Sequence, residues 1–384
     1  MKFRFTDEQE MLRRAAGTFA SRELTADYLR QLDARACAPH GELLPKMAAV
    51  GFTALSVPPE YGGVGGSAID AVVLLEELGR TSLAAAAVLN SAIGFGCDVV
   101  NHYGSEAQKR ELLTKVLQGS MYFACALTEP CACADAATIL NRVTANGDGF
   151  AIDGAGDLVT GATESGCLIV AAHVESAGAA VPGFSLFAID PQAPGIKMRK
   201  LETIGMRGAG SLYEVTYENV RLTRGTLLGT LDSRWEPIQA MLERESIFQA
   251  AYCIGSAQQV IADAVRYAGE RKQFGQAIGK FQAIAHLLAD LQVEADAARW
   301  LMYRAAWSVD RGAPGGKHAA MASLACTEAL LQTTAECMRV YGGYGLTVEF
   351  DIQRHFRDAR SFVAENGSRQ VRRNQIGRAM GLVT

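Results

Sequence analysis

The sequence predicts an α+β protein in which helices are followed by a β domain and then by helices again. The period of the apolar residues changes twice along the chain. It is helical over residues 6–119, close to two over residues 121–232, and helical again over residues 236–381. The predicted domains are therefore an all-α domain at 1–120, a barrel-like β domain at 121–235 and a helical bundle at 236–384.

The composition is that of a folded protein with a large core. Of 384 residues, 49% are hydrophobic and only 20% are charged, which predicts two or three domains and no disorder. The formal net charge is -4, and no run of five basic residues occurs, which argues against nucleic acid as the main partner.

Compartment and metal binding are predicted from the cysteines and the apolar runs. Nine cysteines, mostly inside apolar segments, fit buried, reduced thiols. No uninterrupted apolar run reaches bilayer length and residues 1–10 do not read as a signal peptide, so we expect a cytoplasmic protein without a membrane span. Cys131 and Cys133 lack the second pair that a zinc site needs, so no metal is expected.

Local signals place the elements within the three parts. Thr6 and Gln9 form a capping box that predicts a helix start. The glycines of residues 62–66 are not followed by Gly-Lys-Ser/Thr and do not open a Rossmann helix, so we expect no phosphate loop there. The expected helices are 68–79, 106–119, 281–310 and 317–340, and the expected strands are 122–127, 138–145, 168–173, 184–189 and 212–222.

Residues 241–282 carry the first candidate for catalysis. An apolar stripe at helical spacing follows Glu245, and the stripe consists of Ile247, Ala251, Ile254, Ala257, Ile261 and Val265. We expect Glu245 in the first helical turn, where the helix dipole favours its charge while the apolar stripe raises its pKa. From this stretch alone, an acidic residue placed only for the dipole is the simpler interpretation.

Five short segments form a specific combination by their order and spacing along the chain. They are Ala126-Leu127-Thr128-Glu129-Pro130, Leu158-Val159-Thr160, Arg271-Lys272-Gln273-Phe274-Gly275, Tyr341-Gly342-Gly343-Tyr344-Gly345 and Phe356-Arg357-Asp358-Ala359-Arg360. Together with the order of helical and β parts, they resemble the acyl-CoA dehydrogenase flavoprotein family over essentially the whole chain. The resemblance implies a helical domain, a middle β domain and a C-terminal four-helix bundle, with FAD as cofactor.

The resemblance also implies which residues bind FAD and how the subunits assemble. Leu127, Thr128 and Thr160 match residues against the flavin ring, and Arg271 and Phe274 match residues that reach a neighbouring subunit's cofactor. Such shared sites imply a homotetramer. The other implied cofactor residues are Ala134, Arg339, Gly343, Ser368 and Gln370.

The implied reaction is α,β-desaturation of an acyl thioester on coenzyme A or an acyl carrier protein. A base removes the α proton while hydride passes from the β carbon to flavin N5, and an electron-transfer flavoprotein then takes the electrons. Most members carry the base where this chain has Asn366, and an amide cannot act as one. A smaller branch carries it at the position matched by Glu245, which is therefore the expected base, with Glu365 as the alternative.

A second departure concerns the phosphate cradle of the cofactor site. The family's Gly-Ala-Gly-Ser-Asp loop reads Cys131-Ala132-Cys133-Ala134-Asp135 here, which removes two glycines and a hydroxyl donor. Arg339 replaces a glutamine; it either adds a compensating charge, serves a different anion, or is a surface arginine at a subunit contact. Two alternatives to a complete dehydrogenase therefore remain. One is a degenerate subunit of a hetero-oligomeric dehydrogenase that needs a partner to complete the FAD site, and the other is a non-dehydrogenase flavin or binding role on the same fold.

Overall fold

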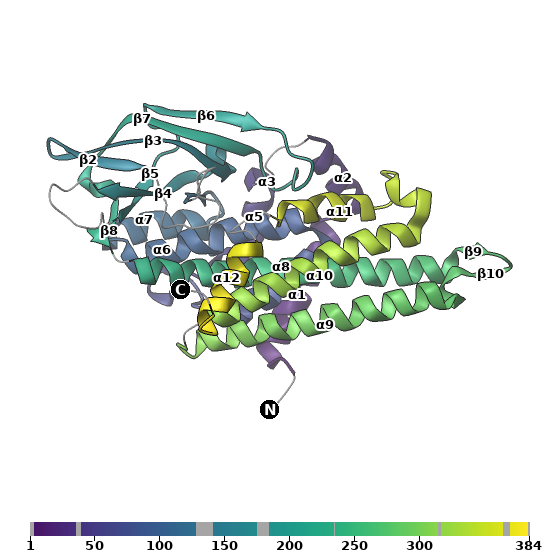
Figure 1. Ribbon diagram of the computed structural model, residues 1–384. Helices are drawn as coiled ribbons and strands as arrows, with labels where there is room; N and C mark the ends of the chain where they lie inside the picture. Colours follow the sequence, from purple (N-terminus) through teal and green to yellow (C-terminus); the bar gives the residue numbers. More distant parts are fainter. Residues whose placement is uncertain are drawn as a thin grey trace.

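The structure is a computed structural model that describes residues 4–35, 40–127, 141–174, 184–233, 235–313, 316–363 and 369–382. In chain order, short helices are followed by a large sheet and then by long helices, and the three parts pack against one another (Figure 1). This arrangement confirms the predicted α+β class, with the sheet between two helical parts of the chain.

The N-terminal helices start where the sequence supplies capping residues. The capping box is confirmed, since Gln9 N–H donates to Thr6 Oγ1 at 3.2 Å and Thr6 N–H donates to Gln9 Oε1 at 3.1 Å. The same motif begins α4 at Ser67 and α7 at Ser105. The helices are α1 (Asp7–Glu23), α2 (Ala26–Arg35), α3 (His40–Ala49), α4 (Ala68–Thr81), α5 (Leu83–Ile93), α6 (Phe95–Tyr103) and α7 (Glu106–Leu117).

The segment formed by α5 and α6 is more apolar than expected. Among the described residues, Leu83–Tyr103 is long and apolar enough to cross a bilayer by composition alone, whereas no such run was expected. Its apolar window is 83% buried within the fold, and Gly94 divides it into two helices. The segment therefore serves as part of the core.

The middle part is one mixed sheet whose strand order is β6-β7-β3-β2-β4-β5-β8, with β1 parallel to β4. β3, β6 and β8 were not predicted as strands. β6 lies at an edge and carries three basic residues in six, which masks the alternating pattern. The strands are β1 (Tyr122–Ala126), β2 (Arg142–Asn146), β3 (Gly149–Thr160), β4 (Gly166–Val174), β5 (Phe184–Ile189), β6 (Ile196–Leu201), β7 (Leu212–Leu222) and β8 (Leu227–Ser233).

β4 contributes to two hydrophobic cores because successive side chains point to opposite faces of a sheet. Ile169 and Ala171 belong to the large core shared with the helices, whereas Leu168, Val170 and Ala172 belong to a second core within the sheet domain. The central strands are therefore covered on both faces, and the helical face is where residues from all three parts meet.

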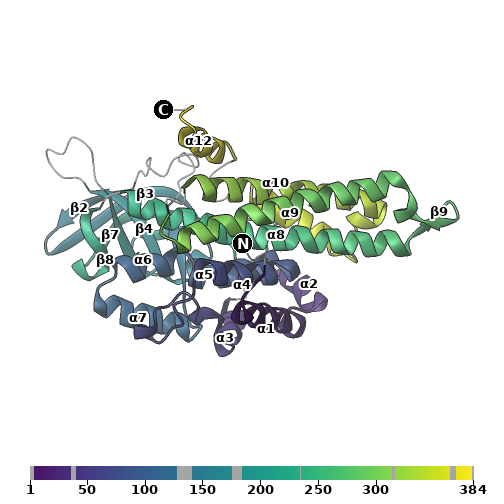
Figure 2. The same cartoon turned by 90° about the horizontal axis from the view of Figure 1, so that it is seen from below.

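The C-terminal part is dominated by three long helices, which run side by side in both views (Figures 1 and 2). On α8, the predicted stripe is buried from Ile247 to Ile261, whereas Val265, its last member, is 52% exposed. A two-stranded hairpin, β9 (Lys272–Gln273) and β10 (Gln276–Ala277), joins α8 to α9. The helices are α8 (Trp235–Glu270), α9 (Gln282–Asp310), α10 (Gly316–Tyr341), α11 (Ile352–Ser361) and α12 (Arg369–Ala379).

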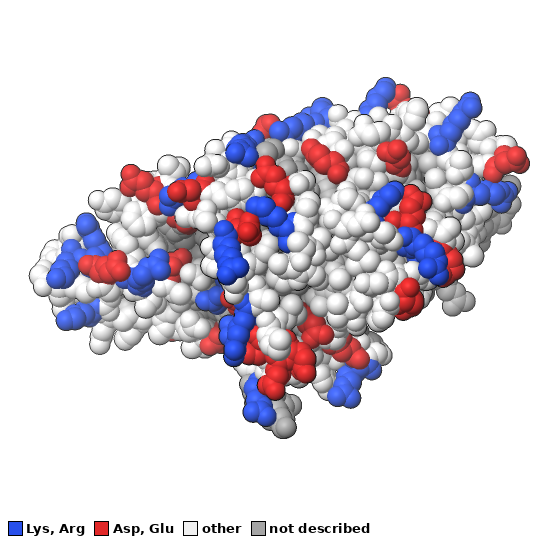
Figure 3. Space-filling model, turned by 180° about the vertical axis from the view of Figure 1, so that it is seen from behind, with Lys and Arg blue, Asp and Glu red and all other residues white. Residues whose placement is uncertain are grey.

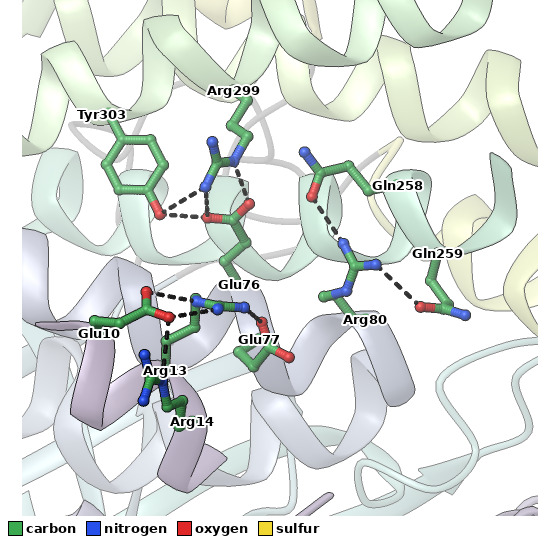
Figure 4. Close-up of polar contacts among 10 residues, drawn as sticks. All are labelled: Glu10, Arg13, Arg14, Glu76, Glu77, Arg80, Gln258, Gln259, Arg299 and Tyr303. Carbon is green, nitrogen blue, oxygen red and sulfur yellow. Dashed lines mark hydrogen bonds and ion pairs between the residues drawn. The ribbon is translucent and has the colours of Figure 1, made fainter. Parts of the chain in front are cut away.

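Polar side chains connect α4 to the long helices (Figure 4), and close backbone contacts add to this packing. The buried Glu76 carboxylate accepts from Arg299 Nε at 2.5 Å and from the Tyr303 hydroxyl. Where α4 crosses α8, a Cβ at Gly255 would lie 2.1 Å from the carbonyl oxygen of Glu76. The first and last parts of the chain are thus held in direct contact.

The surface is charged in both signs. In Figure 3, acidic and basic side chains are interspersed over the face shown, with uncharged surface between them. Several are paired locally, such as Arg266 with Asp263 at 2.9 Å.

Candidate active site

Glu245 lies well inside a helix, so the expectation that it occupies a first turn was wrong. α8 begins at Trp235, and several residues before Glu245 already continue the helix. The favourable effect of a helix N-terminus on a negative charge is confined to about the first turn. The dipole of α8 therefore does not stabilise this carboxylate.

The Glu245 carboxylate instead meets the N-terminus of a different helix. Its Oε1 accepts a hydrogen bond from Asn90 Nδ2 on α5, and its Oε2 accepts from the backbone N–H of Phe95 at 2.9 Å. Phe95 is the first residue of α6, where backbone N–H groups point outward and attract anions. The carboxylate oxygens are thus held by two donors from the N-terminal part of the chain.

Burial raises the pKa of Glu245 to about 7, from an ordinary value of 4.5. The hydrogen bonds from Asn90 and Phe95 favour the charged form and oppose this rise, as does the charge of Arg244, while Asp98 adds to it. The direction agrees with the effect predicted for an apolar environment. A carboxyl group with such a pKa exchanges protons readily at neutral pH.

A buried ion pair fixes α8 against α6 beside Glu245. Arg244 donates to the Asp98 carboxylate, and its guanidinium lies over the ring of Phe248 at 4.7 Å from the centroid. Because both charges are largely buried and paired, they lock the two helices in register. This contact supports the approach of Glu245 to the start of α6.

The same junction reaches strand β1. A Cβ at Gly96 of α6 would lie 2.2 Å from Cβ of Phe123, so α6 packs tightly on the strand. Burial raises the pKa of the Cys125 thiol, and the negative charge of Glu245 adds to that rise. Cys125 and Leu127 pack on the core shared with the helices. Glu245 therefore lies close to the strand that ends at the predicted flavin-binding segment.

The residues predicted to contact the flavin ring lie at strand ends or outside the described residues. Leu127 is buried just after β1, whereas Thr160 is exposed at the end of β3 and pairs with Leu212. Gln370 is exposed at the start of α12. Thr128, Ala134, Ser368 and the alternative base Glu365 lie outside the described residues, as does the loop of residues 131–135.

A second group of predicted residues lines a pocket of about 540 Å³ at the other end of α8. Arg271 and Gly343 both line it, and the Arg271 guanidinium lies over the Tyr344 ring at 5.7 Å. Tyr267 and Tyr341 stack in its wall with their ring centroids 4.3 Å apart. A nucleotide diphosphate is typically bound by groups of these three kinds: a guanidinium, the backbone amides of glycines, and aromatic rings.

Two further residues of this group lie outside the pocket lining. Phe274 is 93% exposed at the tip of the β9–β10 hairpin, in a left-handed backbone conformation with φ of 51°. Arg339 is exposed on α10 and pairs with Glu336. An aromatic side chain so exposed has little contact within its own chain.

The pocket and Glu245 are far apart. Residues 245 and 271 are separated by 26 positions (271 minus 245); Glu245 lies inside α8, and Arg271 directly follows the last residue of that helix. At 1.5 Å per helical residue, this corresponds to about 39 Å. That separation exceeds the length of one dinucleotide, so a cofactor whose ring lies near Glu245 would not reach the pocket of the same chain.

Sequence reasoning missed the residues that surround Glu245. Asn90 is a single amide inside the very apolar α5, and Gly94 separates two apolar helices, so both left a signal in the sequence. Arg372 left none. It is 6% exposed on α12 and donates from Nη2 to Ser246 Oγ at 2.7 Å, and burial lowers its pKa to about 10.

Three sequence profiles match consecutive parts of the chain. They are described as acyl-CoA dehydrogenase N-terminal domain, middle domain and C-terminal domain, and they match residues 6–120, 124–220 and 235–381, respectively.

Whole-chain relatives give the same result. The chain is 33% identical over 378 residues to the 3-(aryl)acrylate reductase of Clostridium sporogenes, covering 97% of this chain and 98% of that one. It is 31% identical over 373 residues to the caffeyl-CoA reductase-Etf complex subunit CarC of Acetobacterium woodii, with 97% and 98% covered. The solved butyryl-CoA dehydrogenase of Megasphaera elsdenii superposes with a TM-score of 0.92 at 28% identity, covering 99% of this chain and all of that one.

Proposed function

Because the chain belongs to the acyl-CoA dehydrogenase family of FAD-dependent oxidoreductases, we propose that it interconverts an acyl thioester and its α,β-unsaturated form, with Glu245 as the general base. The observation that carries this assignment is the Glu245 carboxylate. It has a pKa near 7 and lies at the junction of α5, α6, α8 and β1.

Each half of the proposed reaction has residues assigned to it. FAD, when bound, supplies the hydride acceptor. Glu245 removes the α proton, and burial of its carboxylate makes it basic enough to do so at neutral pH. Leu127 and Thr160, at the ends of β1 and β3, would contact the flavin ring together with Thr128, as the family resemblance implies.

The names of the relatives bear on whether the thioester is oxidised or reduced. Both sequence relatives described above are named reductases, one of them as a subunit of a complex with Etf. A carboxyl group with a pKa near 7 can take a proton in one direction and return it in the other. We therefore propose that the chain exchanges electrons with an electron-transfer flavoprotein and catalyses either oxidation or reduction of the thioester.

The two distant groups of site residues support an oligomeric assembly, and the thiols support a reducing compartment. Arg271, Phe274 and Gly343 would serve the cofactor of a neighbouring subunit, which makes the functional unit an oligomer, proposed as a homotetramer. Six described cysteines are thiols outside any disulfide, which fits a reducing cytoplasm; they are Cys97, Cys125, Cys167, Cys253, Cys326 and Cys337.

The test is the rate of flavin bleaching in single turnovers with a panel of acyl-CoA and acyl carrier protein thioesters. Glu245→Gln should retain FAD but lose at least about 10²–10⁴-fold in rate, because it removes the proton acceptor. Glu243→Gln is the matched control. It exchanges another partly buried carboxylate of α8, which accepts from Gln239 at 3.1 Å.

Two outcomes would contradict the assignment. Full-rate bleaching in Glu245→Gln, with loss in a Glu365→Gln variant, would transfer the role to the alternative carboxylate. A purified chain that is colourless and gains flavin only with a second, different subunit would support the heterotetramer in place of the homotetramer.

A further inference from the structure

The N-terminal helices and the proposed base meet across a long stretch of sequence. Asn90 and Phe95 lie 155 and 150 residues before Glu245, yet together they engage both of its carboxylate oxygens. The base is on α8, whereas its hydrogen-bond donors are on α5 and α6. The orientation of the carboxylate is therefore set by how these helices pack.

We propose that Asn90 and Gly94 are positioning residues, which together clamp the Glu245 carboxylate against the first amide of α6 and thereby set the pH range in which it accepts a proton. This inference rests on the proposed function of Glu245. We call the side chain of Asn90, the Cα of Gly94 and the Phe95 N–H the α5–α6 clamp.

The hydrogen bond to Glu245 accounts for the buried amide of Asn90 in an apolar helix. Asn90 is 6% exposed in a helix whose other members are mostly Ala, Val and Leu. Its Oδ1 has no hydrogen-bond partner among the described residues, so the carboxylate is the partner that its side chain has there. Burying an amide for one hydrogen bond is costly unless that bond is to a charged group.

Position 94 has no room for a side chain, which explains the glycine. It links α5 to α6, and a Cβ there would lie 2.4 Å from Glu245 Oε2 and 2.7 Å from the backbone oxygen of Asn90. Both contacts are closer than any Cβ adopts without a shift. Only glycine therefore lets the carboxylate reach the Phe95 N–H, and any side chain at position 94 would displace it.

Other titratable groups near Glu245 come from four elements, and one of these groups is the buried Arg372 of α12, which donates to the neighbouring Ser246. Asp98 of α6 and Arg244 of α8 pair with each other, and the Cys125 thiol of β1 is held neutral by burial. The effects of the Asp98 and Arg244 charges on Glu245 oppose each other. Loss of the clamp should therefore destabilise the ionised carboxylate, and no other nearby charge should offset this effect.

The first readout is the ionisation of Glu245 itself. In the full-length protein, pH-difference infrared spectra follow the carboxyl band, which is assigned by its loss in Glu245→Gln. Asn90→Leu should move the midpoint upward by about one to two pH units, since a hydrogen bond to a charged group is worth about 10- to 100-fold in the dissociation constant. Asn90→Asp, which keeps the shape but adds a like charge, should move it upward further.

The second readout is the pH profile of flavin bleaching in the FAD-loaded enzyme with an acyl thioester that it turns over. Asn90→Leu should shift the rising limb upward by the same one to two units, so that its rate recovers at high pH. Gly94→Ala should lose rate at every pH, because the carboxylate itself is displaced. Asn101→Leu is the control, since Asn101 of α6 donates to the Ser56 carbonyl at 3.0 Å and not to Glu245.

An unmoved infrared midpoint and an unmoved pH profile in folded Asn90→Leu would overturn the clamp. Should that variant not fold, Asn90→Ala, which removes the amide donor without adding bulk or charge, gives the same decision. The clamp and the proposed function fail separately. A shifted infrared midpoint together with full-rate bleaching in Glu245→Gln would keep the clamp and refute Glu245 as the base.

Discussion

At the residue scale, the state of Glu245 is a balance of two opposing effects. Burial at the junction of α5, α6, α8 and β1 disfavours the charged form, whereas the donors from Asn90 and Phe95 favour it. Burial is the larger effect, so the carboxyl group is more basic than an exposed glutamate. The buried charge lowers the stability of the fold but makes the carboxylate a stronger base, a combination typical of catalytic sites.

This balance predicts how Glu245 affects stability with pH. Its pKa is higher in the folded state, about 7, than the ordinary value of 4.5, so between these pH values the folded protein binds more protons than the unfolded one. Its contribution to stability therefore falls as pH rises through this window. At pH 8, the cost is at most about 3 kcal/mol.

Glu245→Gln should thus raise the free energy of unfolding at pH 8 but change it little at pH 4.5. Urea unfolding of both proteins at the two pH values measures this difference. The contrary result is a gain in unfolding free energy over wild type that is no larger at pH 8 than at pH 4.5. It would show that burial does not penalise the charge.

At the element scale, close helix packing depends on glycines at the crossing of α4 and α8. A Cβ at Gly79 would lie 2.5 Å from the Tyr252 backbone, and one at Gly255 would lie 2.1 Å from the Glu76 carbonyl oxygen. The obstructing atoms are backbone and cannot rotate away. This crossing also holds the N-terminal helices in register with α8, on which the α5–α6 clamp depends.

Gly255→Ala should therefore destabilise the fold by about 1–3 kcal/mol, the usual cost of forcing an extra methyl group into a packed interface. Gly269→Ala is the matched control on the same helix, where an added Cβ meets nothing within 4 Å. It should be neutral or stabilising by up to about 1 kcal/mol, because alanine favours helix. Equal urea midpoints for the two variants would contradict this account.

At the scale of the whole molecule, the length of α8 separates Glu245 from the Arg271 pocket. Glu245 lies on α8 and Arg271 directly follows the end of this helix, so at about 1.5 Å per residue the two are too far apart to serve one cofactor. The exposed Phe274 beside that pocket is a side chain that a neighbouring subunit would cover. Both observations support a shared, oligomeric site.

A shared site can be tested by mixing two inactive variants. In Arg271→Gln, loss of a charge-assisted hydrogen bond should weaken flavin binding by about 10- to 100-fold. Co-expressed with Glu245→Gln, it should regain activity, because one subunit supplies the intact base and the other the intact pocket. The measurement is flavin bleaching per flavin, with Arg266→Gln as an exposed arginine control on α8.

Activity in the mixed oligomer that stays at the level of the two parents would show that each chain completes its own site. Arg271→Gln that retains flavin like wild type after extensive dialysis would remove the pocket from the cofactor site altogether.

The sequence by itself determined the order of the three parts, the caps that begin the helices, and the motifs that identify the family. These signals are local, because the period of apolar residues and the capping side chains act over a few residues. Thr6 and the buried residues of α8 up to Ile261 follow from them. The edge strand β6 did not, because exposed basic residues hide its alternation.

Only the tertiary structure decided what surrounds Glu245. The pKa of a carboxylate depends on its burial and on donors that can come from anywhere in the chain, and here they come from Asn90 and Phe95. The helix that contains Glu245 starts at Trp235, and the stabilising N-terminus belongs to α6. The packing of helices distant in sequence, which no local pattern encodes, brought them together.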